Sequence, residues 1–285
     1  MPEEPRVEHV SDTALWVAAL RAQEGERPEP LFRDPLAARL AGARGRGLVK
    51  SMKASAMTGW VLALRTQAID RLVLGAVARG VDTIVNLGAG LDTRPYRLAL
   101  PTTLRWLEID FPNIIDLKSS ALEHEKPSCV LDRIPVDLSR SDDLHAALSG
   151  ALVASSQTAV LTEGVLQYLE PSTVAALASE LRLQTAVRYW ILDYHHGGIP
   201  GRYAQVIAKD LRAAPFRFQT ADMFGYFRDY GFEVDEKILL AEEAERLRRW
   251  PPLSLAMLSS LLFSTPSARK AMRQRSGWAL FEKRA

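Results

Sequence analysis

The chain has 285 residues, of which 47% are hydrophobic and 25% are charged, and this composition excludes a disordered, collagen-like or fibrous protein. The 36 Lys and Arg residues against 34 Asp and Glu leave a net charge of only +2, so we expect no nucleic-acid partner. The one cysteine, Cys129, excludes an internal disulfide framework and a cysteine-rich zinc site.

The first 80 residues are predicted to be helical, and we expect them to form an N-terminal helical cover. Their opening segment, MPEEPRVEHVSD, lacks the apolar core of a signal peptide, and no later apolar run is long enough to span a bilayer. We therefore expect a cytoplasmic protein with no membrane partner. Cap residues and apolar spacing predict helices over 14–22 (capped by Ser11 or Asp12), 36–41 (after Asp34-Pro35) and 58–78, with a loose glycine-rich segment at 42–47.

From residue 81 onward, short apolar runs rich in β-branched residues alternate with helical or loop segments. This alternation is typical of a parallel sheet covered by helices on both faces, which is an α/β fold. We expect one structural domain with its core in 81–285 and a lid within 197–275. The predicted strands are 83–87, 104–109, 134–136, 159–161, 188–192, 231–240 and 278–282, and a broken helix is predicted over 246–272.

Two groups of side chains near the C-terminus each have two interpretations. An aromatic group either lines an apolar pocket or packs a helix against the sheet, and the basic stretch 246–275 is either solvated surface or attracts an acidic substrate. The aromatic group consists of Phe216, Phe218, Phe224, Tyr226, Phe227 and Tyr230.

Acidic residues follow four of the predicted strands. Asp110, Asp137, Glu163 and Asp193 each stand at the carboxyl end of an apolar run, and the first strand ends in the turn Gly88-Ala89-Gly90. Open α/β sheets bind their ligands at the carboxyl ends of parallel strands, and a glycine turn lets the backbone approach a ligand closely. The pattern predicts a ligand site at this edge of the sheet.

The glycine turn and Asp110 narrow the choice of nucleotide cofactor. The run from Gly88 is GAGLDT, so Thr93 stands where a dinucleotide fingerprint has its third glycine. Asp110 lies 20 residues past Gly90, where an acid can accept both hydroxyls of a ribose. The missing glycine favours S-adenosyl-L-methionine (SAM) over NAD, because SAM brings no pyrophosphate to the helix. The alternative is a plain tight turn with Asp110 as a helix cap.

Four segments carry a resemblance to a known family: VNLGAGLDTRPYRL (85–98), WLEIDFPNIIDLKSSAL (106–122), PVDL (135–138) and LTEGVLQYL (161–169). They are similar to the leucine carboxyl methyltransferase family of SAM-dependent methyltransferases, most of all to the bacterial branch that includes enzymes methylating polyketide carboxyl groups. The resemblance implies a class I SAM-dependent methyltransferase fold, which is Rossmann-like with a mainly parallel seven-stranded sheet.

The resemblance also implies roles for individual residues that hold the cofactor. Arg65 is implied to bind the methionyl carboxylate of SAM, and Glu163 is implied to offset its ammonium group. Gly88 and Gly90 would form the turn against the cofactor, Asp110 would bind the ribose, and Asp137 and Leu138 would contact the adenine. Three of these residues also have an alternative, purely structural role: Arg65 would lie on a solvated helix face, Asp137 would cap a helix, and Glu163 would pair with a neighbouring base.

The acceptor contacts are predicted from the chemistry of methyl transfer. A carboxylate is ionised at pH 7 and needs only a cation or hydrogen-bond donor to place it, for which Arg94 and Tyr168 are candidates. The alternatives are that Arg94 pins the loop by pairing with an acid and that Tyr168 belongs to the core. A phenol would benefit from a base, and His195, with His196 beside it, is the candidate. No metal site is predicted.

The sequence therefore predicts a SAM-dependent O-methyltransferase that acts on the carboxylate of a small-molecule, polyketide-like acceptor. The alternatives are a phenol or hydroxyl O-methyltransferase, a non-catalytic SAM-binding module and, disfavoured by Thr93, an NAD-dependent oxidoreductase. The family's eukaryotic enzymes carry a substrate-facing lysine near the N-terminus, for which Lys50 and Lys53 are candidates. The oligomeric state and the identity of the acceptor stay open.

Overall fold

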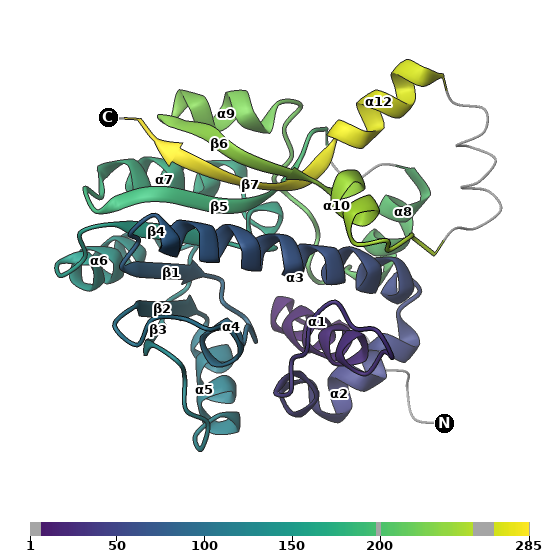
Figure 1. Cartoon of the computed structure of the whole chain (residues 1–285), viewed down its shortest axis with the longest axis horizontal. Helices are drawn as coiled ribbons and strands as arrows, with labels where there is room; N and C mark the ends of the chain where they lie inside the picture. The colour runs from purple at the N-terminus through teal and green to yellow at the C-terminus, as the bar shows by residue number, and fades with distance from the viewer. Residues whose placement is uncertain (1–6, 198–200, 253–264, 285) are drawn as a thin grey trace.

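A seven-stranded sheet forms the centre of the molecule (Figure 1). The structure is a computed structural model and describes residues 7–197, 201–252 and 265–284. The strand order is β3-β2-β1-β4-β5-β7-β6, and β7 runs antiparallel to both of its neighbours. The strands are β1 (Thr83–Leu87), β2 (Arg105–Asp110), β3 (Val130–Pro135), β4 (Thr158–Thr162), β5 (Val187–His195), β6 (Phe232–Leu239) and β7 (Ser276–Lys283).

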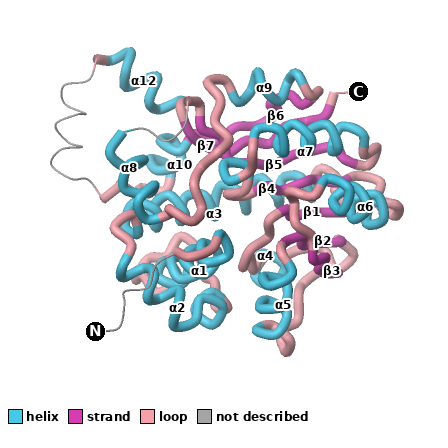
Figure 2. Tube along the Cα trace, turned by 180° about the vertical axis from the view of Figure 1, so that it is seen from behind, coloured by secondary structure: helices cyan, strands magenta, loops and turns pink. Residues whose placement is uncertain are grey.

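Helices cover both faces of the sheet. Figure 1 shows α3 lying along one face, and Figure 2 shows α6, α7 and α9 in front of the other. The described helices are α1 (Val10–Gly25), α2 (Ala37–Ser51), α3 (Ser55–Ala78), α4 (Arg94–Arg97), α5 (Pro112–Ala121), α6 (Ser141–Leu152), the 3-10 turn η1 (Leu166–Tyr168), α7 (Pro171–Leu183), α8 (Gly201–Asp210), α9 (Met223–Asp229), α10 (Leu240–Arg246) and α12 (Pro266–Gln274).

The strands at the centre of the sheet are buried on both faces, whereas the edge strand β3 is only partly buried. Trp106 on β2 packs into the core beneath α3, and Trp190 on β5 packs against Phe227 of α9 with ring centroids 4.7 Å apart. Continuous apolar runs, rather than alternating ones, are what a parallel sheet with two covered faces requires. The predicted α/β fold with seven strands is confirmed.

The N-terminal helices differ from the prediction in two respects. Helix α1 is capped by His9 rather than by Ser11 or Asp12, and the Asp12 carboxylate instead accepts from the His9 backbone N–H. The glycine-rich segment predicted to be loose is helical as far as Ser51, with a kink at Gly42. Gly45 is buried, and a Cβ there would collide with the carbonyl oxygen of Leu15, so this glycine allows α1 and α2 to touch.

The prediction of a broken helix over 246–272 is correct at 266–272 and wrong at 247–252. Helix α10 ends at Arg246, proline follows at 251 and 252, and α12 begins only at Pro266; residues 253–264 lie outside the described part. The aromatic group divides, because Phe218 and Phe227 belong to the core whereas Phe216 lines a cavity. No helix in the described ranges is long and apolar enough to cross a membrane.

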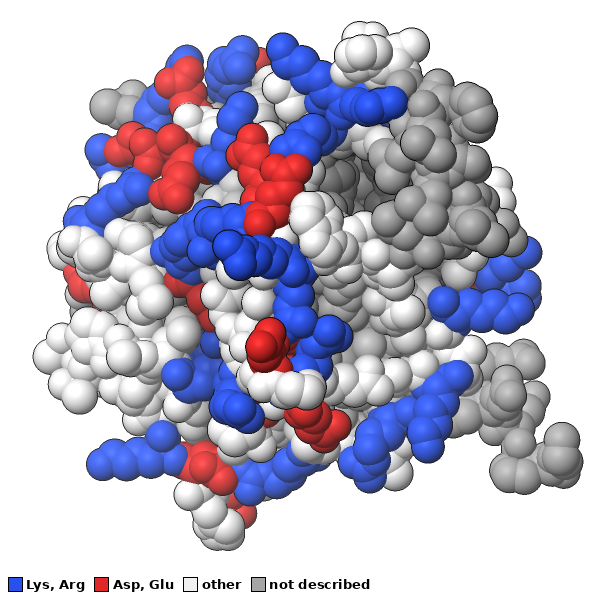
Figure 3. Space-filling model, turned by 45° about the vertical axis from the view of Figure 1, so that its right-hand side comes forward, with Lys and Arg blue, Asp and Glu red and all other residues white. Residues whose placement is uncertain are grey.

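Three arginines of the basic stretch 246–275 form ion pairs with neighbouring acids. Arg246 pairs with Glu243 at 2.7 Å, Arg249 pairs with Glu24 at 3.0 Å, and Arg273 pairs with Glu245 at 2.5 Å. Figure 3 shows basic side chains lying among acidic ones over much of this face. These ion pairs match the interpretation as solvated surface, whereas Arg275 of the same stretch lines a cavity and donates to two backbone carbonyls.

Candidate cofactor and acceptor site

A cavity of about 1570 Å³ opens at the carboxyl ends of β1, β2 and β4, between α1, α3 and α8. All ten site residues predicted from the sequence line it, so residues from Arg65 to His195 meet in one space. Arg97 and Lys53 also line it, whereas Lys50 and His196 do not. His196 instead accepts from the Met223 backbone N–H and meets the Phe224 ring edge-on.

The turn after β1 brings backbone to the wall of the cavity. Gly88 has φ +65°, the left-handed region that favours glycine, and its N–H donates to the Ile109 carbonyl at 2.7 Å. A Cβ at Gly88 would collide with Cγ2 of Val165, the residue that follows the TEG motif after β4. Glycine is therefore required here for two reasons: the positive φ disfavours any residue with a Cβ, and Val165 leaves no room for one.

Asp110 at the end of β2 is held by the same turn. Its Oδ2 accepts from the Gly90 N–H at 2.6 Å, and its Oδ1 accepts from the Phe111 N–H at 2.7 Å. Burial raises the pKa of Asp110 above its usual range, although the two N–H donors oppose the shift. The carboxylate is fixed in direction while it lines the cavity, as an acceptor for a diol should be.

Asp137 and Leu138 follow β3 at the far side of the turn. One oxygen of Asp137, Oδ1, accepts from the Ser139 N–H at 2.9 Å, which is the short-range contact of the capping alternative. Both residues nevertheless line the cavity, and Leu138 packs against the core as a half-buried apolar wall. A cap and a cofactor contact are compatible here, because a carboxylate has further acceptor positions.

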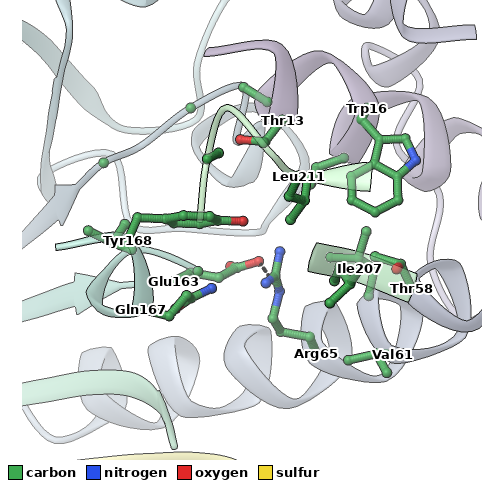
Figure 4. Close-up of a pocket in the computed structure, with 18 of the residues that line it drawn as sticks. Thr13, Trp16, Thr58, Val61, Arg65, Glu163, Gln167, Tyr168, Ile207 and Leu211 are labelled. Carbon is green, nitrogen blue, oxygen red and sulfur yellow. Dashed lines mark ion pairs between the residues drawn. The ribbon is translucent and has the colours of Figure 1, made fainter. Parts of the chain in front are cut away.

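Glu163 lies between two arginines from different parts of the chain. Its Oε1 is 2.7 Å from Nε of Arg65 on α3, and its Oε2 is 2.7 Å from Nη1 of Arg94 (Figure 4). Yet Arg65 Nε and Glu163 Oε2 are buried and have no well-aligned hydrogen bond in the described structure. Burial raises the pKa of Glu163, but Arg94 and Arg65 outweigh it, so the pKa lies below its usual value of 4.5.

Arg94 is buried among carboxylates. Its Nε is 2.7 Å from Asp70, and its Nη1 is 2.8 Å from Asp92 in addition to the Glu163 contact. The side chain is only 3% exposed, and these partners raise its pKa well above the usual value despite the opposing effect of burial. This geometry matches the alternative in which Arg94 pins the loop by pairing with an acid.

Tyr168, Gln167 and His195 line the cavity beyond Glu163. The Tyr168 ring meets Phe216 edge-on at 5.3 Å, and the Gln167 side-chain amide has no hydrogen-bond partner among the described residues. His195 Nδ1 lies 3.0 Å from the Ser276 hydroxyl. Burial lowers the pKa of His195, and Arg65 and Arg275 add to the shift against the pull of Asp193, so the ring is neutral at pH 7.

Comparison with known proteins supplies the family. A model of leucine carboxyl methyltransferases matches residues 14–182, more than half of the chain. The chain belongs to the leucine carboxyl methyltransferase family. A relative from Streptomyces coelicolor, named as a candidate SAM-dependent methyltransferase, is 35% identical over 241 residues, which are 78% of this chain and 82% of that protein. A similarly named relative from Frankia alni is 38% identical over 175 residues, or 58% of this chain and 61% of that protein.

A solved structure agrees on the fold. A candidate methyltransferase from Thermobifida fusca superposes with a TM-score of 0.58 at 16% identity, covering 99% of this chain and 96% of that one. At this identity the likeness shows the class I methyltransferase fold alone. With the sequence relatives, it makes this leucine carboxyl methyltransferase family member a SAM-dependent methyltransferase.

The site fits SAM on the evidence of its own atoms. The buried, poorly satisfied Arg65 Nε and Glu163 Oε2 are groups that a zwitterionic methionyl end would complete, since one is a cation and the other an anion. At the other end, Asp110 and Asp137 present fixed acceptors, as a ribose and an adenine amine require. These four residues thus offer the donors and acceptors that would be needed to hold SAM.

Several residues of this family member's cavity were missed from the sequence. Gln167 stands directly before the predicted Tyr168, so the TEGVLQYL motif was an available signal for it. Trp16, Ile207 and Leu211 gave no signal, because apolar residues on amphipathic helices are equally typical of core. Asp193, predicted with the other acids, accepts from the Gly164 N–H at 2.5 Å and from Trp278 at 3.1 Å, which is a structural role.

Replacing Asp110 by alanine is expected to weaken SAM binding by about 10–100-fold, because hydrogen bonds to a charged group contribute about 1.5–3 kcal/mol. Titration calorimetry with SAM measures this, and D132A, at an exposed position on β3, is the control. Because burial raises the pKa of Asp110, affinity should begin to fall on acidification at a higher pH than an ordinary aspartate would allow. Equal affinity of D110A and the unaltered protein for SAM would contradict the predicted contact between Asp110 and the ribose.

Proposed function

We propose that the chain transfers the methyl group of SAM to the carboxylate of a small-molecule, polyketide-like acceptor. The observation that supports this is a group of cavity-lining donors that no carboxylate engages in the described structure: Lys53, Gln167 and Arg275. Arg275 donates to the carbonyls of His196 and Gly197, both at 2.9 Å, which fix its guanidinium without cancelling its charge. Fixed positive charge suits an anionic acceptor.

Methyl transfer to a carboxylate requires little of the protein beyond holding the acceptor and SAM in the right positions. A carboxylate is already ionised at pH 7 and carries its own nucleophilic oxygen, so no group has to remove a proton. Bound SAM supplies a methyl group on a positively charged sulfur. What the chain contributes is alignment, through Asp110 and Arg65 at one end and the acceptor donors at the other, and displacement of water from the cavity by the two ligands.

A phenol acceptor is the second candidate, and His195 supports it. The imidazole lines the same cavity and is neutral at pH 7 because burial lowers its pKa, so it is able to accept a proton. Its Nδ1 is engaged with the Ser276 hydroxyl, which fixes the ring and leaves Nε2 as the nitrogen available for such a role. A base of this kind contributes typically 10²–10⁴-fold to a rate.

One experiment separates the two candidates. The protein is incubated with methyl-labelled SAM and pairs of acceptors that share a ring skeleton, one bearing a carboxylate and one a phenol. Mild base releases methanol from a methyl ester but not from a methyl ether. We expect base-labile label from the acids, with H195Q retaining the unaltered rate and pH profile between pH 6 and 9. Base-stable label that H195Q loses by 10²-fold or more would establish the phenol reaction instead.

A further inference from the structure

The cavity is larger than SAM alone requires. Pockets that enclose one drug-sized ligand are about 300–1,000 Å³, whereas this cavity measures about 1570 Å³. The groups assigned to SAM, from the glycine turn to Arg65 and Glu163, all lie toward the sheet. The volume beyond them is therefore available to a second ligand that reaches the same polar centre.

The wall of this outer volume is apolar. Figure 4 shows Tyr168, Glu163 and Gln167 to one side of Arg65, and Trp16, Ile207 and Val61 to the other. Trp16, Ile207 and Leu211 line the cavity and form one cluster with Leu62 and Met52, and they show 2%, 6% and 2% of their surfaces. Val61 and Phe216, which line the same cavity, are half-buried and show it more of theirs. Trp16 donates its indole N–H to the Ser55 hydroxyl at 3.0 Å, so it offers the cavity an apolar ring rather than a polar edge.

The polar groups at the margin do not turn this wall into a polar site. Thr13 and Thr58 already have interaction partners, and the charged residues among those labelled in Figure 4 are Arg65 and Glu163, which pair with each other. Lys53 and Arg275, the proposed acceptor donors, also line the cavity. A sugar or a nucleotide would leave many of its hydroxyls unpaired against Trp16, Ile207 and Leu211, at a cost of about 1–3 kcal/mol for each buried group. The wall thus selects against polar ligands and for hydrocarbon or aromatic surface.

We infer that Trp16, Val61, Ile207, Leu211 and Phe216 form an acceptor subsite for an apolar body of several carbons or a ring. The reacting group of the acceptor then lies at the Arg65–Gln167 end. The acceptor class is an amphipathic acid rather than a short or polyhydroxylated one. The acid part of this statement rests on the proposed function, whereas the apolar subsite stands on the cavity wall alone.

The test measures binding along two homologous series. The protein is saturated with S-adenosylhomocysteine and titrated by calorimetry with linear carboxylic acids of 4–12 carbons and with the matching primary alcohols, each below its micelle concentration. Burying a methylene favours binding by about 0.8 kcal/mol, which is about fourfold per carbon. We expect both series to tighten at close to that slope until the subsite is full, with the acids binding more tightly than alcohols of equal length.

Variants locate the subsite on the wall. L211Q keeps the approximate size but adds an amide, and it is expected to reduce the slope to about twofold per carbon or less. L183Q makes the same change at an exposed position on α7, across the sheet from the cavity, and should leave the slope unchanged. If L211Q fails to fold, the slope of the unaltered protein still decides the matter.

The outcomes separate the subsite from the reaction. An affinity that does not depend on chain length, or a hexuronic acid that binds as tightly as a ten-carbon acid, overturns the subsite. If acids are methylated but their binding does not depend on chain length, the proposed function is supported and the subsite is contradicted. If binding of both series depends on chain length but no methyl ester forms, the subsite is supported and the carboxylate reaction is contradicted.

Discussion

Replacing Arg94 by methionine is expected to lower the free energy of unfolding by about 3–5 kcal/mol at pH 7, the cost of removing one partner from a buried ion pair. The effect is large because one guanidinium, 3% exposed, lies within 2.8 Å of carboxylates of Asp70, Asp92 and Glu163. Arg97 retains Asp70 at 2.6 Å and Arg65 retains Glu163 at 2.7 Å, so the variant leaves mainly Asp92 as an unbalanced buried charge. Urea unfolding at pH 7 measures the loss.

The pH dependence of this variant has a definite sign. In the unaltered protein the pKa values of Asp92 and Glu163 are below their usual range, since Arg94 outweighs burial. Such groups add stability that is present above their unfolded pKa of about 4 and is lost only as the pH falls through the folded value. Without Arg94, Asp92 loses the partner that lowers its pKa most, whereas Glu163 keeps Arg65. Burial then raises the pKa of Asp92, so stability is lost as the pH rises.

We therefore expect the stability of R94M to increase from pH 7 to pH 5, where that of the unaltered protein stays nearly constant. The matched control is R39M, because Arg39 pairs with Glu125 at the surface, where an ion pair contributes about 0–1 kcal/mol. A loss at Arg94 no larger than the loss at Arg39, or the same pH slope in both variants, would contradict the assigned network.

The sequence indicated the inner edge of this site because its signals are local. Each acid at that edge follows its own apolar strand, and Gly88 begins the turn that presents Asp110, so short windows of sequence were enough to predict their positions. These parts of the prediction needed no knowledge of which residues meet in space.

The contacts that determine the rest are formed between distant residues. Arg65, Arg94 and Glu163 come from α3, the start of α4 and the end of β4, and nothing near Arg94 in sequence shows that it would be buried against acids from two of them. Gly45 was interpreted as loop because glycine is rare inside helices, yet its role is a close helix–helix contact with Leu15. Tertiary packing decided both.

The outer wall of the cavity also could not be predicted from local sequence. Trp16 lies on α1, whose apolar residues are spread around the helix, and Ile207 lies on the amphipathic helix α8, so their positions in sequence predict burial but not what buries them. Whether that face meets other side chains or a ligand depends on the volume left between α1, α3 and α8, which no local pattern specifies. Acceptor specificity is therefore the property of this protein that its sequence motifs describe least.

Replacing Gly88 by alanine is expected to destabilise the protein by about 2–5 kcal/mol and to abolish measurable SAM binding. A left-handed backbone costs a residue with a Cβ about 1–2 kcal/mol, and overpacking adds about 1–3 kcal/mol. The overpacking arises because the new methyl group would collide with Cγ2 of Val165, whereas the other Val165 atoms, Cγ1 and Cβ, are 3.4 and 3.5 Å away. Thermal unfolding and calorimetry with SAM measure the two losses.

The chain supplies variants that divide this cost into its two parts. G42A has a similar φ of +57° but open space around the new methyl group, so it should show the backbone cost alone. G150A, on an exposed turn of α6 with nothing within 4 Å, should show neither cost and should gain about 0.5–1 kcal/mol. In the double variant G88A/V165A the collision is gone because the nearest remaining atom is the 3.5 Å Cβ, so stability should recover by about 1–3 kcal/mol relative to additivity. Full additivity of the two substitutions would mean that Gly88 is required by its backbone angle only.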